Sequence, residues 1–283
     1  MHITGSTRVF LILGYPVEQV RAPEMFNRLF ERHAVDAVLV PAQVAPQDLE
    51  PFVRQAFKAR NIDGLWVTIP HKAAMRGLLD RCDLRGEVAQ AVNAVRRNAN
   101  GTLEGALFDG LGFVKGLGIF GVPAARARAL VVGVGGAGVA IAVSLAERGV
   151  AALALFDCDT QRCKSVAQRI RQAFGIQVQV QTVLDPAGFD LVVNASPLGL
   201  NLDDPLPLDV SRLDPGSAVV DILMKNQPTP LLRQCHARGI KAFPGYEMMI
   251  QQASAYLDFF GLHELARVID DDASEVRAML QAG

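Results

Sequence analysis

The sequence has little that would mark a metalloprotein or a disulfide-stabilised domain. Its four cysteines lie at positions 82, 158, 163 and 235, and they do not form two pairs with the spacing of a zinc ribbon. The five histidines are scattered, and no pair of them forms an HExxH pattern. We therefore expect packed, reduced thiols, as in cytoplasmic proteins, and no metal ion.

Long apolar runs and an excess of one charge are missing too. No stretch of about 18 apolar residues could span a bilayer, and the first residues, MHITGSTRVFLILG, lack the charged start and small-residue cleavage site of a secretion signal. The net charge is −1 with both signs interspersed, which argues against nucleic acid or anionic membrane as the main partner. We expect a cytoplasmic monomer or homodimer that binds a small molecule.

What the sequence does contain is alternation of β-rich and helical stretches. The chain has 283 residues, half of them apolar, which is enough for two modest domains. The alternation indicates βαβ units and parallel sheets. In the first part, strands are predicted at 8–14, 37–44, 63–69, 90–97 and 102–108, and helices at 23–34, 46–60 and 71–80.

The pattern changes near residue 110. The segment DGLGFVKGLGIFGVP, 109–123, predicts a helix that connects two domains and ends at glycine and proline. A new α/β unit follows, and after residue 247 the chain is predicted to be helical. This second unit begins with ARALVVGVGGAGVAIAVSLAERGV, 127–150, and its further strands are expected at 151–157, 176–183, 189–194 and 217–222, with helices between them. We place domain boundaries near 112 and 244.

A glycine-rich loop, VVGVGGAG, stands between a β-branched strand and an alanine-rich helix. One glycine permits a tight turn, one lets backbone N–H groups approach a pyrophosphate, and one lets helix and strand pack closely. The helix N-terminus adds a partial positive charge. The loop predicts a dinucleotide site formed by Gly133, Gly135, Gly136, Ala137 and Gly138.

Asp157 ends the next predicted strand, about 20 residues beyond the last glycine. A carboxylate at this place binds the ribose hydroxyls of NAD and repels the 2′-phosphate of NADP. No arginine follows directly, since position 158 is a cysteine, although Arg162 lies close enough to allow some use of NADP. The sequence therefore favours NAD. The alternative is that Asp157 only caps the helix beginning near Asp159.

Seven motifs together resemble the shikimate/quinate dehydrogenase family in their order and spacing. They span nearly the whole chain, and VTIPHK with the later AVN and FDG runs is more specific than any single one. The motifs are GYPVEQVRAPEMFN (14–27), VTIPHK (67–72), AVN (91–93), FDG (108–110), GVGGAG (133–138), NASPLG (194–199) and GYEMMIQQA (245–253).

The resemblance implies an α/β fold with two domains. Residues 1–112 and 245–283 would form an α/β substrate domain to which the C-terminal helices return, and 113–244 a Rossmann NAD(P)-binding domain. By the same resemblance, Lys72 and Asp109 are the catalytic pair at the ring hydroxyl that is oxidised. The chemistry is consistent with this, because taking a hydride from a carbinol requires removal of its O–H proton.

The resemblance assigns further residues to the ligands. Asn93 would bind ring hydroxyls through amide donor and acceptor, and Gln252 of the C-terminal helix and Thr68 of VTIPHK would also contact the substrate. A family loop near the cofactor corresponds to Asn194, Ser196 and Pro197. Without the resemblance, a polar helix residue such as Gln252 would be read as solvent-exposed.

The chain departs from the family on the substrate side. Two serines that usually hold the substrate carboxylate are Val20 and Ala22, the usual asparagine before VT is Trp66, and the tyrosine expected after DIL is Met224. The usual NTDG run reads LFDG. Losing a hydroxyl that binds a carboxylate typically costs about 1–3 kcal/mol. Arg21 is a candidate to bind the substrate carboxylate in place of the serines, because its guanidinium suits a carboxylate. The alternative is that Arg21 is an ordinary charged residue of the loop surface.

Two hypotheses follow. The first is an NAD(P)-dependent dehydrogenase acting on shikimate, quinate or a related hydroaromatic alcohol, divergent from the biosynthetic enzyme. The second is a non-catalytic or differently specific NAD-binding paralogue. Joint retention of Lys72 and Asp109 speaks against a pure binder. A third option, a folate-type two-domain dehydrogenase, is disfavoured by VTIPHK and AVN together.

Overall fold

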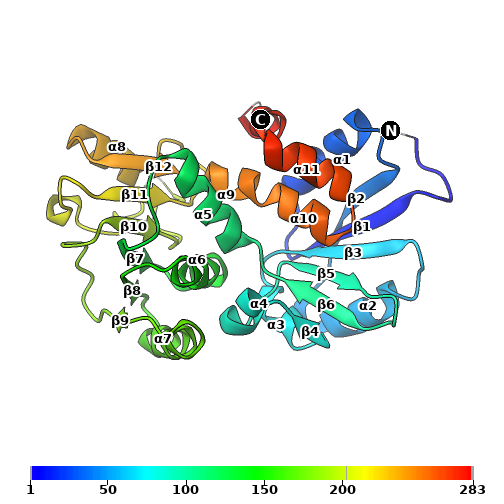
Figure 1. Ribbon diagram of the computed structural model, residues 1–283, viewed down its shortest axis with the longest axis horizontal. Helices are drawn as coiled ribbons and strands as arrows, with labels where there is room; N and C mark the ends of the chain where they lie inside the picture. The colour runs from blue at the N-terminus through cyan, green and yellow to red at the C-terminus, as the bar shows by residue number, and fades with distance from the viewer. Residues whose placement is uncertain (1, 202, 282–283) are drawn as a thin grey trace. The chain divides into compact units, whose positions relative to one another are not determined.

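The chain folds into two compact units, each with its own sheet. The computed structural model describes residues 2–201 and 203–281. Unit 1 comprises the residues up to Phe108 and those from Ala253 onward, and unit 2 spans Asp109–Gln252 (Figure 1). The sequence-based boundaries near 112 and 244 fall inside the first helix of unit 2 and at the end of its last strand.

Unit 1 is built on a mixed sheet with strand order β2-β1-β3-β5-β6-β4. Strands β1, β2 and β3 pair in parallel, whereas β5 is antiparallel to both β3 and β6. The elements are β1 (Arg8–Gly14), α1 (Ala22–Arg32), β2 (Ala37–Gln43), η1 (Pro46–Asp48), α2 (Leu49–Ala56), β3 (Ile62–Val67), α3 (Lys72–Arg76), β4 (Arg81–Cys82), α4 (Leu84–Ala89), β5 (Ala94–Arg97), β6 (Leu103–Ala106), α10 (Ala253–Phe259), α11 (His263–Asp271) and α12 (Ser274–Gln281).

The two faces of the central strand β3 bury different side chains. Leu65 and Val67 belong to an aliphatic core that includes residues of α2, because alternate side chains of a strand point to opposite faces. Trp66 points to the other face, where it stacks on Tyr256 of α10 with ring centroids 5.3 Å apart and contacts Phe26 of α1 at 5.2 Å. The position that departs from the family is thus part of an aromatic core.

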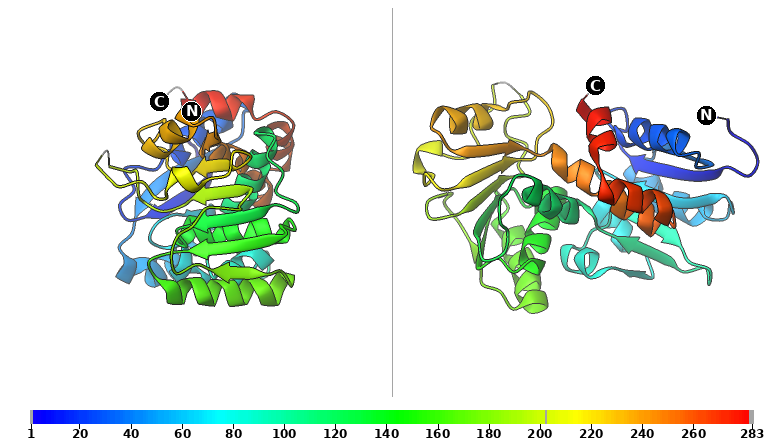
Figure 2. Two further views of the ribbon diagram at one scale, coloured as in Figure 1. Left: turned by 90° about the vertical axis from the view of Figure 1, so that its left-hand side faces the viewer. Right: turned by 45° about the horizontal axis from the view of Figure 1, so that its top comes forward.

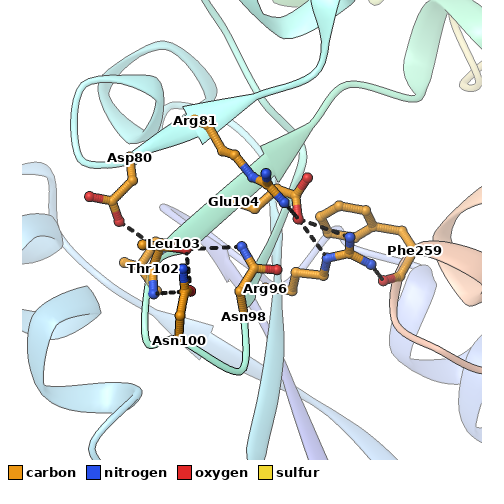
Figure 3. A network of polar contacts seen from close by, with 9 residues as sticks. All are labelled: Asp80, Arg81, Arg96, Asn98, Asn100, Thr102, Leu103, Glu104 and Phe259. Carbon is orange, nitrogen blue, oxygen red and sulfur yellow. Dashed lines mark hydrogen bonds and ion pairs between the residues drawn. The ribbon is translucent and has the colours of Figure 1, made fainter.

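Arg96 connects the C-terminal helix α10 to the β5–β6 hairpin (Figure 3). Its guanidinium donates to Glu104 on β6 at 2.8 and 3.0 Å and to the carbonyl of Phe259, at the end of α10, at 2.6 Å. It also lies over the Phe259 ring, 4.4 Å from the centroid. Arginine suits this position because its planar group donates in several directions at once.

Arg96→Ala should lower the free energy of unfolding by about 1–3 kcal/mol, because it removes charge-assisted hydrogen bonds to a carboxylate and a helix-terminal carbonyl. Arg96→Lys should recover only part of this loss. The neighbouring exposed residue gives the control, Arg97→Ala, which should change stability little. Chemical denaturation measures the difference; equal effects of Arg96→Ala and Arg97→Ala would contradict the assignment.

Unit 2 contains an entirely parallel sheet whose strands lie side by side in Figure 2. Its strand order is β12-β11-β10-β7-β8-β9, the Rossmann arrangement with a switch point between β7 and β10. The elements are α5 (Asp109–Ile119), β7 (Arg128–Val132), α6 (Gly136–Glu147), β8 (Ala152–Phe156), α7 (Thr160–Phe174), β9 (Val178–Val180), β10 (Leu191–Asn194), η2 (Val210–Arg212), β11 (Ala218–Asp221), α8 (Pro230–Ala237), β12 (Lys241–Pro244) and α9 (Tyr246–Gln251).

The α/β fold agrees with the sequence analysis, and the strands predicted at 90–97 and 102–108 correspond to β5 and β6, which pair with each other; several elements differ. The strand predicted at 90–97 begins only at Ala94, and the helix predicted at 71–80 ends at Arg76. The helix predicted over 46–60 is a 3₁₀ turn followed by α2, which ends at Ala56. Strands β4 and β12 and helices α4 and α8 were not predicted individually, because segments of two to eight residues carry too little periodicity.

The helices give no indication of a membrane segment. In the described part of the chain, none combines the length and the apolar character needed to cross a bilayer.

Candidate active site

The predicted substrate residues of unit 1 gather at one edge of its sheet. Strands β1 and β3 are parallel, so the loops after Gly14 and Val67 leave the sheet on the same side. Backbone hydrogen bonds join these loops: Thr68 N donates to Leu13 O at 2.9 Å, and Tyr15 N donates to Ile69 O at 3.0 Å. Thr68 and Ile69 of VTIPHK therefore lie beside the loop that follows β1.

Lys72 and Asn93 come together at the same edge. Lys72 begins α3 and is half-buried; its carbonyl accepts a hydrogen bond from Val92 N at 3.0 Å. Asn93 lies where antiparallel β5 begins, beside the end of β3, and its carbonyl accepts from Val67 N at 2.7 Å. The VTIPHK and AVN motifs, about 20 residues apart, are thus adjacent in space.

The Asn93 side chain is buried and only half satisfied. Its Oδ1 accepts from Phe108 N at 3.0 Å, and this bond fixes the amide. Its Nδ2 has no partner among the described residues, although Asn93 is 0% exposed. A buried polar group without a partner costs free energy. The Nδ2 group is therefore a hydrogen-bond donor available to an oxygen atom of a ligand.

Asp109 and Gln252 form a second group, in unit 2. Asp109 is the first residue of α5, directly after Phe108, and it is buried. Gly112, one turn further along α5, faces α9: a Cβ added there would lie 2.9 Å from the Cβ of Gln252. Residues three apart share a helix face, so Asp109 and Gln252 lie at the same end of the α5–α9 pair. Gln252 Oε1 is buried without a partner among the described residues.

Helix α5 also brings Asp109 toward the glycine loop. Its second residue, Gly110, packs on α6 so closely that a Cβ would lie 2.0 Å from the carbonyl oxygen of Ala140. Ala140 is in the second turn of α6, whose first residue is Gly136. Within unit 2, Asp109 therefore lies near α6, the helix that begins at the glycine loop.

The glycine loop has the geometry that a pyrophosphate requires. Gly133 has φ +90°, which favours glycine, and a Cβ at Gly138 would lie 1.9 Å from Gly133 O. At Gly135, by contrast, a Cβ would meet no described protein atom within 4 Å. The loop is closed where helix and strand touch and open before the α6 N-terminus, so these residues fit a dinucleotide.

Asp157 is held against this loop. Its Oδ2 accepts from Val134 N at 2.7 Å, and its Oδ1 accepts from Asp159 N at 2.9 Å. Burial opposes its ionisation, but these backbone donors and Arg162, 3.9 Å away, outweigh burial and hold the pKa of Asp157 below its ordinary value. The cap of α7 is Asp159, which accepts from Arg162 N, so Asp157 is not that cap.

The loop after β10 lies on the other side of the switch point. Asn194, the last residue of β10, is in register with Val132 of β7. Its Oδ1 accepts from the backbone N and the hydroxyl of Ser196 at 3.1 and 2.6 Å. Ser196 N lies 2.6 Å from where a Cβ of Gly133 would be. Pro197 follows and is exposed. These residues border the place where Rossmann sheets bind dinucleotides.

Two candidate substrate positions have other partners. Arg21 Nη1 donates to the carbonyl of Leu280 in α12 at 3.0 Å, which supports its reading as a structural loop residue; binding of a carboxylate by Arg21 stays a prediction. The backbone of Met224 accepts a hydrogen bond from the Tyr246 hydroxyl at 3.1 Å. Val20 and Ala22 are half-buried beside Arg21.

The described residues contain no group of three or more histidine, cysteine, aspartate or glutamate side chains that could hold a metal ion. All four cysteines are free thiols.

Comparison with known proteins agrees with this geometry. Residues 12–95 match the family described as the shikimate dehydrogenase substrate binding domain. The chain is 36% identical over 277 residues to the shikimate dehydrogenase (NADP(+)) of Acidiphilium cryptum, with 96% of each protein covered.

Solved structures show the same fold. A shikimate 5-dehydrogenase from Listeria monocytogenes, in complex with shikimate and NAD, superposes with a TM-score of 0.90 at 24% identity, over 99% of this chain and 98% of that one. A quinate dehydrogenase from Corynebacterium glutamicum, in complex with NAD, gives 0.84 at 28% identity, over 98% and 99%.

Proposed function

Because the chain belongs to the shikimate dehydrogenase family, we propose that it oxidises the ring alcohol of shikimate, quinate or a related hydroaromatic compound with NAD. The chain is an NAD(P)-dependent oxidoreductase.

The proximity of Lys72 and Asn93 at the edge of the first sheet supports their proposed roles most directly. Val92 N donates to the carbonyl of Lys72, and Phe108 N donates to the side-chain oxygen of Asn93; Asp109 follows Phe108 in the chain. In unit 1 an amine and an amide donor, distant in the sequence, thus lie near each other, and the carboxylate of Asp109 is the next residue of the chain after Phe108. An amine and a carboxylate at one hydroxyl can remove and return its proton.

When bound, the nicotinamide would accept the hydride, and this chain's residues would do the rest. Lys72 would take the hydroxyl proton, and Asp109 would orient the hydroxyl. Asn93 Nδ2 would donate to another ring oxygen. Gly133, Gly135 and Gly138 would hold the pyrophosphate, and Asp157 would receive the adenosine ribose. In the proposed domain assignment, 1–112 and 245–283 hold the substrate, and 113–244 hold the cofactor.

Absorbance at 340 nm tests the reaction. With NAD present, shikimate or quinate should give a steady rise as the cofactor is reduced. The departures at Val20, Ala22 and Trp66 favour a second candidate, an enzyme of altered specificity, so the panel should extend to cyclic polyols that lack a carboxylate. Silence across the panel with NAD bound would favour the non-catalytic paralogue.

Cofactor titration tests the role of Asp157. We expect NAD to bind at least about 10-fold more tightly than NADP, equivalent to about 1.4 kcal/mol, because the carboxylate repels a 2′-phosphate. Asp157→Asn should lower the ratio of the NADP dissociation constant to the NAD dissociation constant, because it removes the negative charge. Arg162→Ala should raise this ratio, because Arg162 is the cation near that carboxylate. Of the proteins compared above, one is named for NADP(+) and two were solved with NAD. Tighter NADP binding by the unchanged protein would refute the reading of Asp157.

A further inference from the structure

A buried polar network joins the ends of two strands in the second sheet. Asp221 is the last residue of β11 and is in register with Asn194. Its Oδ2 accepts from the hydroxyl of Thr229 at 2.6 Å, and its Oδ1 accepts from Asn194 Nδ2 at 3.0 Å and from Leu223 N at 3.3 Å. Asp221, Asn194 and Thr229 are each 0% exposed.

The network has a fixed direction. An ionised carboxylate only accepts hydrogen bonds, so Asn194 must turn its NH₂ group toward Asp221. Its carbonyl oxygen then faces Ser196, whose backbone N and hydroxyl both donate to it. An amide turned the other way would place its oxygen against the Asp221 carboxylate and its NH₂ against the Ser196 N–H. Asp221 therefore fixes the orientation of the Asn194 amide, and this orientation allows the amide oxygen to accept hydrogen bonds from Ser196 in the following loop.

The burial of the Asp221 carboxyl group has an electrostatic cost. All three groups that donate to Asp221 are neutral, and burial raises its pKa despite their hydrogen bonds. A raised pKa means that the folded protein holds this proton more tightly than the unfolded chain. The ionised form therefore opposes folding once the pH exceeds that pKa. Such a cost suggests a role other than stabilisation.

The loop that the network controls lies on the dinucleotide site. Ser196 N lies 2.6 Å from where a Cβ of Gly133 would be, and Gly133 begins the glycine loop at the end of β7. Thr229 continues the network in the other direction, since its hydroxyl also accepts from Leu232 N and caps α8. Asp221 thus connects the edge of the cofactor loop to the start of α8.

We propose that Asp221 is a positioning residue for the dinucleotide: through Asn194 it holds the 195–198 loop in the conformation that receives the nicotinamide end of the cofactor. This inference rests on the proposed function of unit 2. Asp221 and Thr229 need not touch the cofactor themselves.

Asp221→Asn tests the proposal without changing the shape of the side chain. We expect the dissociation constant for NADH, measured by fluorescence titration, to rise at least 10-fold. The unfolding temperature at pH 7 should stay within a few degrees of the original, because the variant also removes a buried charge. Asp190→Asn, at the amino edge of the same sheet, is the control, and it should leave the affinity unchanged.

The partner of the carboxylate gives a second, milder test. Thr229→Val removes the donor and should weaken NADH binding several-fold, whereas Thr229→Ser keeps the hydroxyl and should bind like the original. Unchanged affinity of Asp221→Asn would overturn the proposal. Equal dissociation constants for NADH in Thr229→Val and Thr229→Ser would also overturn it. So would a loss of NADH affinity found only in variants that are partly unfolded at the assay temperature. If the original protein binds neither NADH nor NADPH, the proposed function fails instead.

Discussion

Lys72→Ala should abolish hydride transfer while leaving the affinity for NAD nearly unchanged. Positioned acid–base groups typically contribute about 10²- to 10⁴-fold to a rate, so we expect kcat to fall by at least about 100-fold. Lys72 belongs to unit 1, whereas the glycine loop and Asp157 belong to unit 2, which is why cofactor affinity should survive. Steady-state rates at 340 nm and NADH titration measure the two effects.

An exposed lysine of the same unit provides the control. Lys58→Ala, just after α2, should retain full turnover. Asp109→Asn should also lose most activity, because the carboxylate is proposed to orient the same hydroxyl. If Lys72→Ala keeps a substantial fraction of the original turnover, Lys72 does not have the proposed role.

Gly138→Ala should nearly eliminate dinucleotide binding and also destabilise the protein. The added methyl group would lie 1.9 Å from the carbonyl oxygen of Gly133, so the first turn of α6 must move away from the loop. Overpacking of this kind costs about 1–3 kcal/mol, and the displaced loop should weaken NADH binding by at least about 100-fold. Thermal unfolding and fluorescence titration measure the two losses.

Variants at two other glycines distinguish an effect on packing from an effect on ligand contact. A methyl group at Gly135 would meet no described protein atom within 4 Å, so Gly135→Ala should fold normally and lose affinity only by crowding the pyrophosphate. Gly216→Ala, where the Cβ also has open space, should change neither property. Full NADH affinity in Gly138→Ala would show that this loop does not hold the cofactor.

Much of the fold follows from the sequence, because its strongest patterns are local. Gly133, Gly135 and Gly138 indicate the strand–loop–helix unit, and the alternation of strands and helices indicates a parallel sheet, which unit 2 contains. The Asn-Gly sequence at 100–101 likewise indicates a turn between two strands, and in the structure these strands pair as β5 and β6.

The polar networks could not be predicted in the same way, because they depend on register. Nothing local shows that Asp221 and Asn194 would end adjacent strands at the same level, nor that Thr229 would donate to that carboxylate. A strand ending in aspartate, followed by the helix cap Thr-Pro, was a usable signal for Asp221 and Thr229. The contact between Arg21 and Leu280 joins residues 259 apart and had no signal at all.

The departures at the substrate side also have a structural explanation in one case. Trp66 is 2% exposed and packs among Phe10, Phe26 and Tyr256. Its size is therefore accommodated by the aromatic core between the sheet, α1 and α10. For Met224 the structure offers no comparable reason, because only its backbone is held by Tyr246.

A crystal structure with NAD and a bound hydroaromatic ligand tests most directly whether Lys72 and Asp109 serve one hydroxyl. We predict that the Lys72 amine and the Asp109 carboxylate will both lie within hydrogen-bonding distance, about 3 Å, of the same ring oxygen, with the nicotinamide beside that carbon. A ligand whose reacting hydroxyl contacts neither side chain, or a nicotinamide bound away from both, would contradict the account.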